Sequence, residues 1–161
     1  MEKQNINFEI KIFESIEELS QPVFDLMQEA ISIKSKAYSP YSNFQVGAAL
    51  RLANGKVITG NNQENSSYPA GLCAERVALF YTSANYPEQA IKTMALSASP
   101  MNAHNDQPVP PCGSCRQAIA EYEYKSNQPI EIYFMGDRGK VIAVSSVKTL
   151  LPFAFDRSFL K

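Results

Sequence analysis

Strand-like and helix-like segments alternate along this chain, and the alternation limits the folds open to it. Helical periodicity is expected from Ser15 to a point before Tyr38, over 73–81 and over 112–125. The segments with strand patterns are 8–13, 44–52, 56–59, 93–98, 130–135 and 140–144. Helices that separate strands are typical of layered α/β domains, so we expect an α/β fold around a mixed sheet.

Short local signals set the expected ends of these segments. Ser15 and Glu18 have the spacing of a capping box and predict that the first helix begins there. Pro40 disfavours helix in the residue before it, so this helix should end before Tyr38. Asn54-Gly55 predicts a tight hairpin turn. The proline-rich stretch 100–111 is expected to be irregular.

Composition narrows the class of protein. A chain of 161 residues has the usual size of one domain, so we expect a single domain over 1–161. Its 45% hydrophobic content excludes a disordered chain, and its net charge of −1 argues against nucleic acid as a partner. The sequence shows no apolar run long enough for a membrane span and no signal peptide, which favours the cytoplasm.

The three cysteines are the clearest chemical signal. Cys112 and Cys115 form a Cys-x-x-Cys pair directly after Pro111, and Cys73 lies upstream at another expected helix start. An odd number of cysteines in tight clusters is atypical of a disulfide scaffold. A helix start favours anions and lowers thiol pKa values, which suits thiolate binding to zinc. We therefore expect one Zn²⁺ ion per chain.

The ligand count decides what kind of zinc site this is. A structural site needs four protein ligands, and the one histidine, His104, is the remaining candidate. Without His104, a coordination position stays open for water, whose pKa zinc lowers to about 7. Glu75 follows Cys73 closely enough to act as a proton carrier for that water. Arg76, three residues after Cys73, can share its helix face and offset the negative charge of the thiolates.

Less specific interpretations of these residues also exist. A Cys-x-x-Cys pair occurs in redox sites and in structural zinc knuckles. Glu75 and Arg76 can be ordinary solvated helix residues. His104 can close a non-catalytic Cys₃His module, or it can be a surface residue with no part in the site.

The residues around the cysteines resemble the zinc-dependent cytidine deaminases of the all-cysteine, homotetrameric type. The resemblance spans about residues 20–155 and rests on several ordered motifs: 73–76, 111–117, 41–50, 60–65, and the tail 150–152 with 154–155. It implies a three-layer α/β/α fold with a mixed sheet of about five strands. Residues 1–15 then form a short N-terminal extension.

The resemblance also implies an activity: hydrolytic deamination of cytidine and deoxycytidine in pyrimidine salvage. Zinc would be held by Cys73, Cys112 and Cys115, and Glu75 would carry protons. Asn62 and Glu64 match residues that hold the ribose hydroxyls, and a carboxylate there would repel a 5′-phosphate. Further implied substrate contacts are Phe44, Tyr68, the backbone at Cys73 and Ala74, and Phe155, which would reach the active site of a neighbouring subunit in a homotetramer.

The sequence departs from that family at a few positions. Phe153 stands where relatives have a glycine, which puts the path of the tail and the role of Phe155 in question. Asn61 replaces a common cysteine, and the loop 100–111 is longer than in compact members. Two alternative functions remain open: a deaminase of a modified nucleoside, such as an aminonucleoside antibiotic, and a structural-zinc module.

Overall fold

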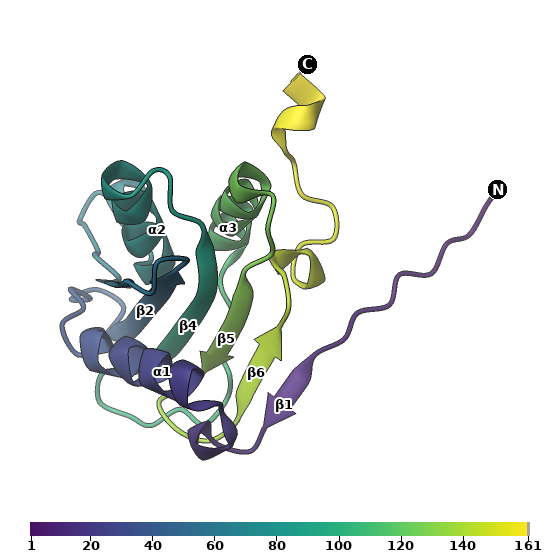
Figure 1. Cartoon of the computed structure of the whole chain (residues 1–161). Helices are drawn as coiled ribbons and strands as arrows, with labels where there is room; N and C mark the ends of the chain where they lie inside the picture. Colours follow the sequence, from purple (N-terminus) through teal and green to yellow (C-terminus); the bar gives the residue numbers. More distant parts are fainter. Residues whose placement is uncertain (161) are drawn as a thin grey trace.

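The computed structural model describes residues 1–160, which are arranged around one six-stranded sheet (Figure 1). The strand order is β1-β6-β5-β4-β2-β3. The strands are β1 (Lys11–Phe13), β2 (Phe44–Leu52), β3 (Val57–Asn61), β4 (Ile91–Pro100), β5 (Glu131–Met135) and β6 (Val141–Val144). Each predicted strand is present, although β1 is shorter than expected.

The sheet is mixed, as predicted. β4 and β5 are parallel, with Ala95 opposite Tyr133, and the other neighbouring pairs are antiparallel. A parallel pair needs a long crossover, which here contains the helix α3 (Gly113–Ser126). The predicted Asn54-Gly55 hairpin joins β2 to β3, and Gly55 has the positive φ of 84° that such a turn requires.

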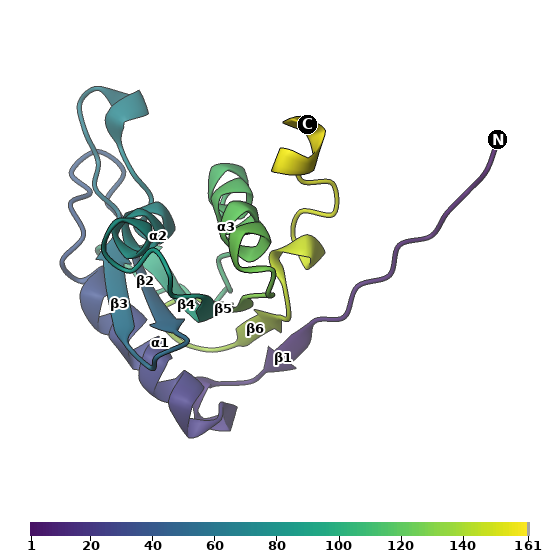
Figure 2. The same ribbon diagram turned by 45° about the horizontal axis from the view of Figure 1, so that its top comes forward.

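Helices cover both faces of the sheet, which confirms the three-layer α/β/α arrangement. α1 (Gln21–Lys34) packs on one face, whereas α2 (Ala74–Asn85) and α3 lie side by side on the other (Figure 2). Two buried clusters fill the layers. Met27, Ala49 and Met135 belong to the cluster under α1, and Leu79, Leu96 and Ile119 belong to the cluster under α2 and α3.

Two details differ from the sequence predictions. The sheet has six strands rather than about five, because β1 pairs with β6 as an extra edge strand. The first α-helix begins at Gln21 rather than at Ser15. Ser15 precedes only a short 3₁₀ turn, Ile16–Glu18, and its side chain makes no capping hydrogen bond. Pro22 lies in the first turn of α1, where a missing N–H costs nothing.

Gly60 controls how closely α2 approaches the sheet. A Cβ atom at this position would lie 2.7 Å from the carbonyl oxygen of Ala74 and 2.8 Å from the backbone nitrogen of Ala78. Only glycine therefore lets the first turn of α2 lie directly against β3. This contact places the start of α2 beside the polar residues that follow β3.

Candidate active site

The two helices on one face of the sheet begin at cysteines. Cys73 is the N-cap residue of α2, Cys112 is the N-cap residue of α3, and Cys115 lies in the first turn of α3. Because α2 and α3 are neighbours, the three Sγ atoms all lie within 4.8 Å of one another. Cys73 is 3.8 Å from Cys112, and Cys112 is 3.5 Å from Cys115, sulfur to sulfur.

This sulfur geometry fits a zinc ion. Zinc–sulfur bonds of about 2.3 Å at tetrahedral angles put ligand sulfurs about 3.8 Å apart. The three cysteines would therefore supply three of four tetrahedral positions. His104 does not belong to the cluster; its Nδ1 lies 2.7 Å from Oδ2 of Asp137 instead. The donor set thus matches a catalytic zinc site with one open position, rather than a Cys₃His structural module.

The electrostatics of the cluster favour thiolate at Cys73. Hydrogen bonding with Cys115 is the main cause that lowers the pKa of Cys73 to about 5, and the nearby guanidinium of Arg76 adds to it. The same interaction with Cys73, together with burial, raises the pKa of Cys115. Arg76 donates from Nη2 to the Cys73 sulfur over 3.7 Å. This contact agrees with the charge-offsetting position that the sequence predicts for Arg76.

Glu75 lies next to this cluster and is almost completely buried, with 4% of its surface exposed. Burial is the main cause that raises its pKa, and the charge of Cys73 acts in the same direction. A carboxyl group with a raised pKa takes up a proton more readily than an ordinary glutamate. Such a group suits proton transfer near neutral pH.

A cavity of about 490 Å³ opens in front of the cysteines. It brings together seven of the predicted site residues from four segments of the chain: Phe44, Asn62, Glu64, Tyr68, Cys73, Glu75 and Arg76. Cys112 is an eighth predicted site residue in the lining, so the cysteine cluster forms one wall. The size suits a small molecule.

The two residues predicted to hold a sugar are fixed by hydrogen bonds. Asn62 Oδ1 accepts from the backbone N–H of Val46 over 2.8 Å, and Nδ2 donates to the carbonyl of Phe44 over 2.9 Å. Asn62 therefore also ties the turn after β3 to the start of β2, which carries Phe44. This second role is not visible in the sequence.

Glu64 is held by the turn before β2. Its carboxylate accepts hydrogen bonds from the hydroxyl of Ser42, at 2.5 Å, and from the backbone N–H of Tyr41, at 2.9 Å. The bond from Ser42 is the main cause that lowers the pKa of Glu64 below its ordinary value. Glu64 thus presents a fixed negative charge at the rim of the cavity.

Three predicted site residues do not line the cavity. Cys115 is fully buried and belongs to the site only through the cysteine cluster. The side chain of Ala74 is fully buried in the core, so only its backbone is available to a ligand. Phe155 is 58% exposed and stacks on Phe159, with 5.7 Å between ring centroids. The tail that carries Phe155 lies on the far side of α3 from α2 (Figure 1). The contact of Phe155 with a neighbouring subunit stays a prediction.

Sequence reasoning missed residues that shape the cavity. Val109 and Pro110 of the long loop line it beside Cys112, and Ser42 lines it while orienting Glu64. Arg116 holds the end of this loop, because its Nε donates to the carbonyl of Pro111 over 2.8 Å. Val109 and Pro110 lie close to Cys112 in the sequence, and this was the available signal that they belong to the site. The path of an irregular loop, however, cannot be derived from a sequence pattern.

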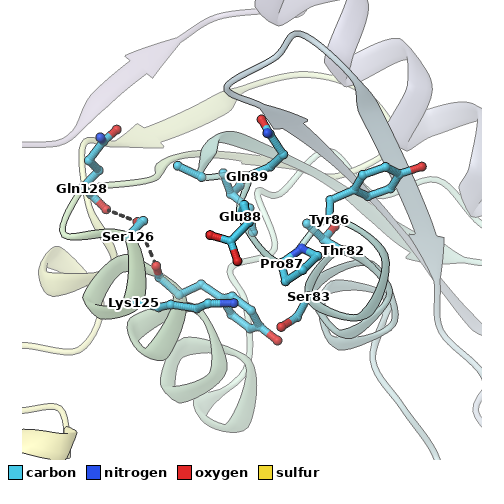
Figure 3. Close-up of a pocket in the computed structure, with 12 residues that line it drawn as sticks. Thr82, Ser83, Tyr86, Pro87, Glu88, Gln89, Lys125, Ser126 and Gln128 are labelled. Atoms are coloured by element: carbon cyan, nitrogen blue, oxygen red, sulfur yellow. Dashed lines mark hydrogen bonds between the residues drawn. The ribbon is translucent and has the colours of Figure 1, made fainter.

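A separate cavity of about 300 Å³ lies between the C-terminal ends of α2 and α3 (Figure 3). Its polar lining includes Glu88 and Lys125, and the hydroxyl of Ser126 donates there to the carbonyl of Tyr122 over 2.9 Å. None of the predicted site residues is among those that line it. The chemistry therefore centres on the cavity at the helix starts.

Comparison with known proteins agrees with this site. The profile of the family described as "Cytidine and deoxycytidylate deaminase zinc-binding region" matches residues 22–128. The chain is 42% identical over 130 residues to a cytidine deaminase of Halalkalibacterium halodurans, covering 81% of this chain and 91% of that protein. It is 38% identical over 135 residues to a cytidine deaminase of Sporosarcina psychrophila, covering 84% and 92%.

A solved structure shows the same fold. The crystal structure of cytidine deaminase from Burkholderia pseudomallei superposes with a TM-score of 0.71 at 39% identity, covering 81% of this chain and 97% of that one. The fold, the cysteine cluster and the sequence thus agree on one class of protein, the zinc-binding deaminases. The chain belongs to the cytidine and deoxycytidylate deaminase family. Among residues 1–160, no helix is both long and apolar enough to cross a membrane.

Proposed function

We propose that the protein hydrolytically deaminates cytidine and deoxycytidine, giving uridine or deoxyuridine and ammonia. The observation that carries the proposal is the buried Glu75 beside three cysteine sulfurs, at the wall of a cavity of about 490 Å³. The relatives named cytidine deaminase support this choice of substrate.

Cys73, Cys112 and Cys115 hold the zinc ion. When bound, zinc supplies a water molecule acidic enough to ionise near neutral pH. Glu75 takes a proton from the attacking water and transfers it to ring nitrogen N3 of the base. In the next step Glu75 takes the proton of the new C4 hydroxyl group and delivers it to the amino group, so that ammonia leaves and the C4 carbonyl forms. One carboxyl group can serve both steps, because each transfer returns it to the state that the next one needs.

Other residues of the cavity bind and orient the nucleoside. Asn62 and Glu64 hold the sugar hydroxyls, Phe44 packs beside the nucleoside, and the backbone at Cys73 and Ala74 reads the polar edge of the base. Arg76 moderates the negative charge of the thiolates. Glu64 also excludes a 5′-phosphate, because like charges would meet at the rim of the cavity.

We propose further that the chain is one domain and assembles as a homotetramer in the cytoplasm, where it serves pyrimidine salvage. In the tetramer, Phe155 completes the active site of a neighbouring subunit, and Tyr68 lies near that subunit junction. The exposure of Phe155 and Tyr68, at 58% and 76%, supports this assignment, since both rings are open to a partner in the single chain.

The test is ammonia release from cytidine by the zinc-loaded protein, with cytidine 5′-monophosphate and adenosine as comparison substrates. Release from cytidine but not from the other two is the expected result. The control variant is Glu75→Gln, which keeps size and burial and should bind zinc while losing nearly all turnover. Full activity in that variant would refute the role of Glu75, and no release from wild-type protein would refute the proposed substrate.

A further inference from the structure

The segment before and within β1 has an alternating pattern that the single chain leaves unused. We call residues 6–12 the arm. Its apolar side chains occur at every second position, and all are substantially exposed: Ile6 49%, Phe8 46%, Ile10 49% and Ile12 56%. The arm leaves the body of the molecule beyond β1 in both views (Figures 1 and 2).

β1 is also an edge strand. It pairs with β6 on one side only, with Ile12 opposite Ile142, and no strand of residues 1–160 lies on its other side. An extended, apolar edge of this kind is a template for another strand. Since the apolar positions alternate, their side chains all lie on one face of the sheet. A strand added to this edge could place its own side chains beside all of them.

We propose that the arm pairs antiparallel with the arm of a second copy of this chain, about a two-fold axis at Ile10. This pairing joins the two sheets into one continuous sheet. It places Ile10 opposite Ile10 of the partner and Phe8 opposite Ile12 of the partner, so that six apolar side chains at and beside the axis protect one another.

The charges of the arm select this register. Glu9 and Lys11 lie on the face opposite to the apolar residues, and neither takes part in an ion pair within residues 1–160. Centring on Ile10 sets each Glu9 opposite the partner's Lys11. A register centred on Glu9 or on Lys11 would set like charges face to face, as would parallel pairing, and like charges directly opposite destabilise a sheet.

The remaining surroundings of these charges are compatible with the pairing. Glu9 and Lys11 lie over a shallow hollow lined by Tyr133 and Ala143, with Glu131 as the other charged group. The hollow lies at the β1 edge of the sheet, whereas the strands nearest the active-site cavity are β2 and β3 at the other edge. The contact therefore joins copies without closing the active site, and it does not depend on the proposed deamination.

A disulfide test reports the register directly. In Ile10→Cys the two introduced thiols face each other across the axis, with Cα atoms about 4.5–5.5 Å apart, which a disulfide can span. Mild oxidation of the zinc-loaded protein should yield a covalent dimer with a 10–10 linkage by peptide mapping. The matched control is Phe8→Cys, whose thiols would be about 13 Å apart along the strands and should not link. Equal linking of both variants, or of neither, would overturn the proposal.

Charge reversal tests the same pairing without a covalent bond. Lys11→Glu sets Glu opposite Glu twice and should weaken the association about tenfold in sedimentation equilibrium. The double variant Glu9→Lys/Lys11→Glu restores opposite charges and should regain the wild-type association. Turnover per chain should be the same in all three proteins. A failure of the double variant to recover would overturn the proposed register.

Discussion

Asn62 offers the sharpest test of how the cavity is held together. Its side chain makes two hydrogen bonds to the start of β2, accepting from Val46 N–H at 2.8 Å and donating to the Phe44 carbonyl at 2.9 Å. Asn62→Ala removes both and leaves two backbone groups unpaired. At about 0.5–1.5 kcal/mol per bond, the loss is about 2 kcal/mol. For a domain of this size that corresponds to a melting temperature about 6 °C lower.

The charged isostere should behave differently. In Asn62→Asp one carboxylate oxygen still accepts from Val46 N–H, but the other faces the Phe44 carbonyl oxygen with no proton between them. The folded state then binds a proton more tightly than the unfolded chain, so the pKa of the new carboxyl group is raised. Stability linked to this proton is present at low pH and lost as pH rises through the raised pKa. Asn62→Asp should therefore be less stable than Asn62→Ala at pH 7, with a smaller difference near pH 4.

The assay is thermal unfolding of the zinc-loaded variants, followed by calorimetry at several pH values, together with kinetics on cytidine. KM should rise about tenfold in Asn62→Ala, because Phe44 and the proposed sugar contact are both released. Asn65→Ala is the matched control: this exposed asparagine makes one hydrogen bond, to Ser67 N–H, and its loss should cost under about 1 kcal/mol. Equal melting temperatures for Asn62→Ala and wild type would refute the reasoning.

Three further predictions concern stability and metal. The buried carboxylate of Glu123 accepts three hydrogen bonds, two of them from backbone N–H groups at 2.9 Å, so Glu123→Ala should cost about 4 kcal/mol in urea unfolding and Glu123→Gln clearly less. The pKa of Asp137 is lowered overall, because hydrogen bonds, first from His104, and the charge of Lys34 outweigh the opposing effect of burial. The contribution of Asp137 to stability is therefore present at neutral pH and lost as pH falls below about 4. Asp137→Asn should thus be less stable than wild type at pH 7, and the difference in thermal unfolding should shrink steadily as pH falls below about 4. Cys115→Ser should reduce bound zinc well below one ion per chain by elemental analysis, and chelation should lower the melting temperature of wild type but not of this variant.

The parts of the fold that were predicted correctly depend on neighbouring residues in the sequence. β2 begins at Phe44 and ends at Leu52 as its apolar pattern indicates, and Asn54-Gly55 forms the predicted turn. The starts of α2 and α3 were also predicted from local signals, and each falls within one residue of Cys73 or Cys112. Because both helices cover one face of the sheet, correct starts were sufficient to bring the three sulfurs together.

The errors arose where distant segments decide. Ser15 has the spacing of a capping box, yet the chain turns away after Leu19, whose extended backbone has a ψ of 151°, and Pro22 begins the true helix. The sixth strand of the sheet was missed for the same reason, because a pattern predicts that 8–13 is extended but not that β6 is its neighbour. Propensity is local, whereas pairing and packing are not.

The active-site cavity shows the same division between local and distant causes. Val109 and Pro110 line it only because the loop before Cys112 is fixed at both ends. At one end, Asp137 accepts a hydrogen bond from the backbone N–H of Asn105 at 2.5 Å. At the other, Arg116 donates one to the carbonyl of Pro111 at 2.8 Å. Arg116 also donates to the carbonyl of Leu150 over 2.9 Å, so it links this loop to the tail that carries Phe155. The cysteines set the chemistry from a few adjacent residues, whereas the shape in which that chemistry takes place depends on bonds between segments far apart in sequence.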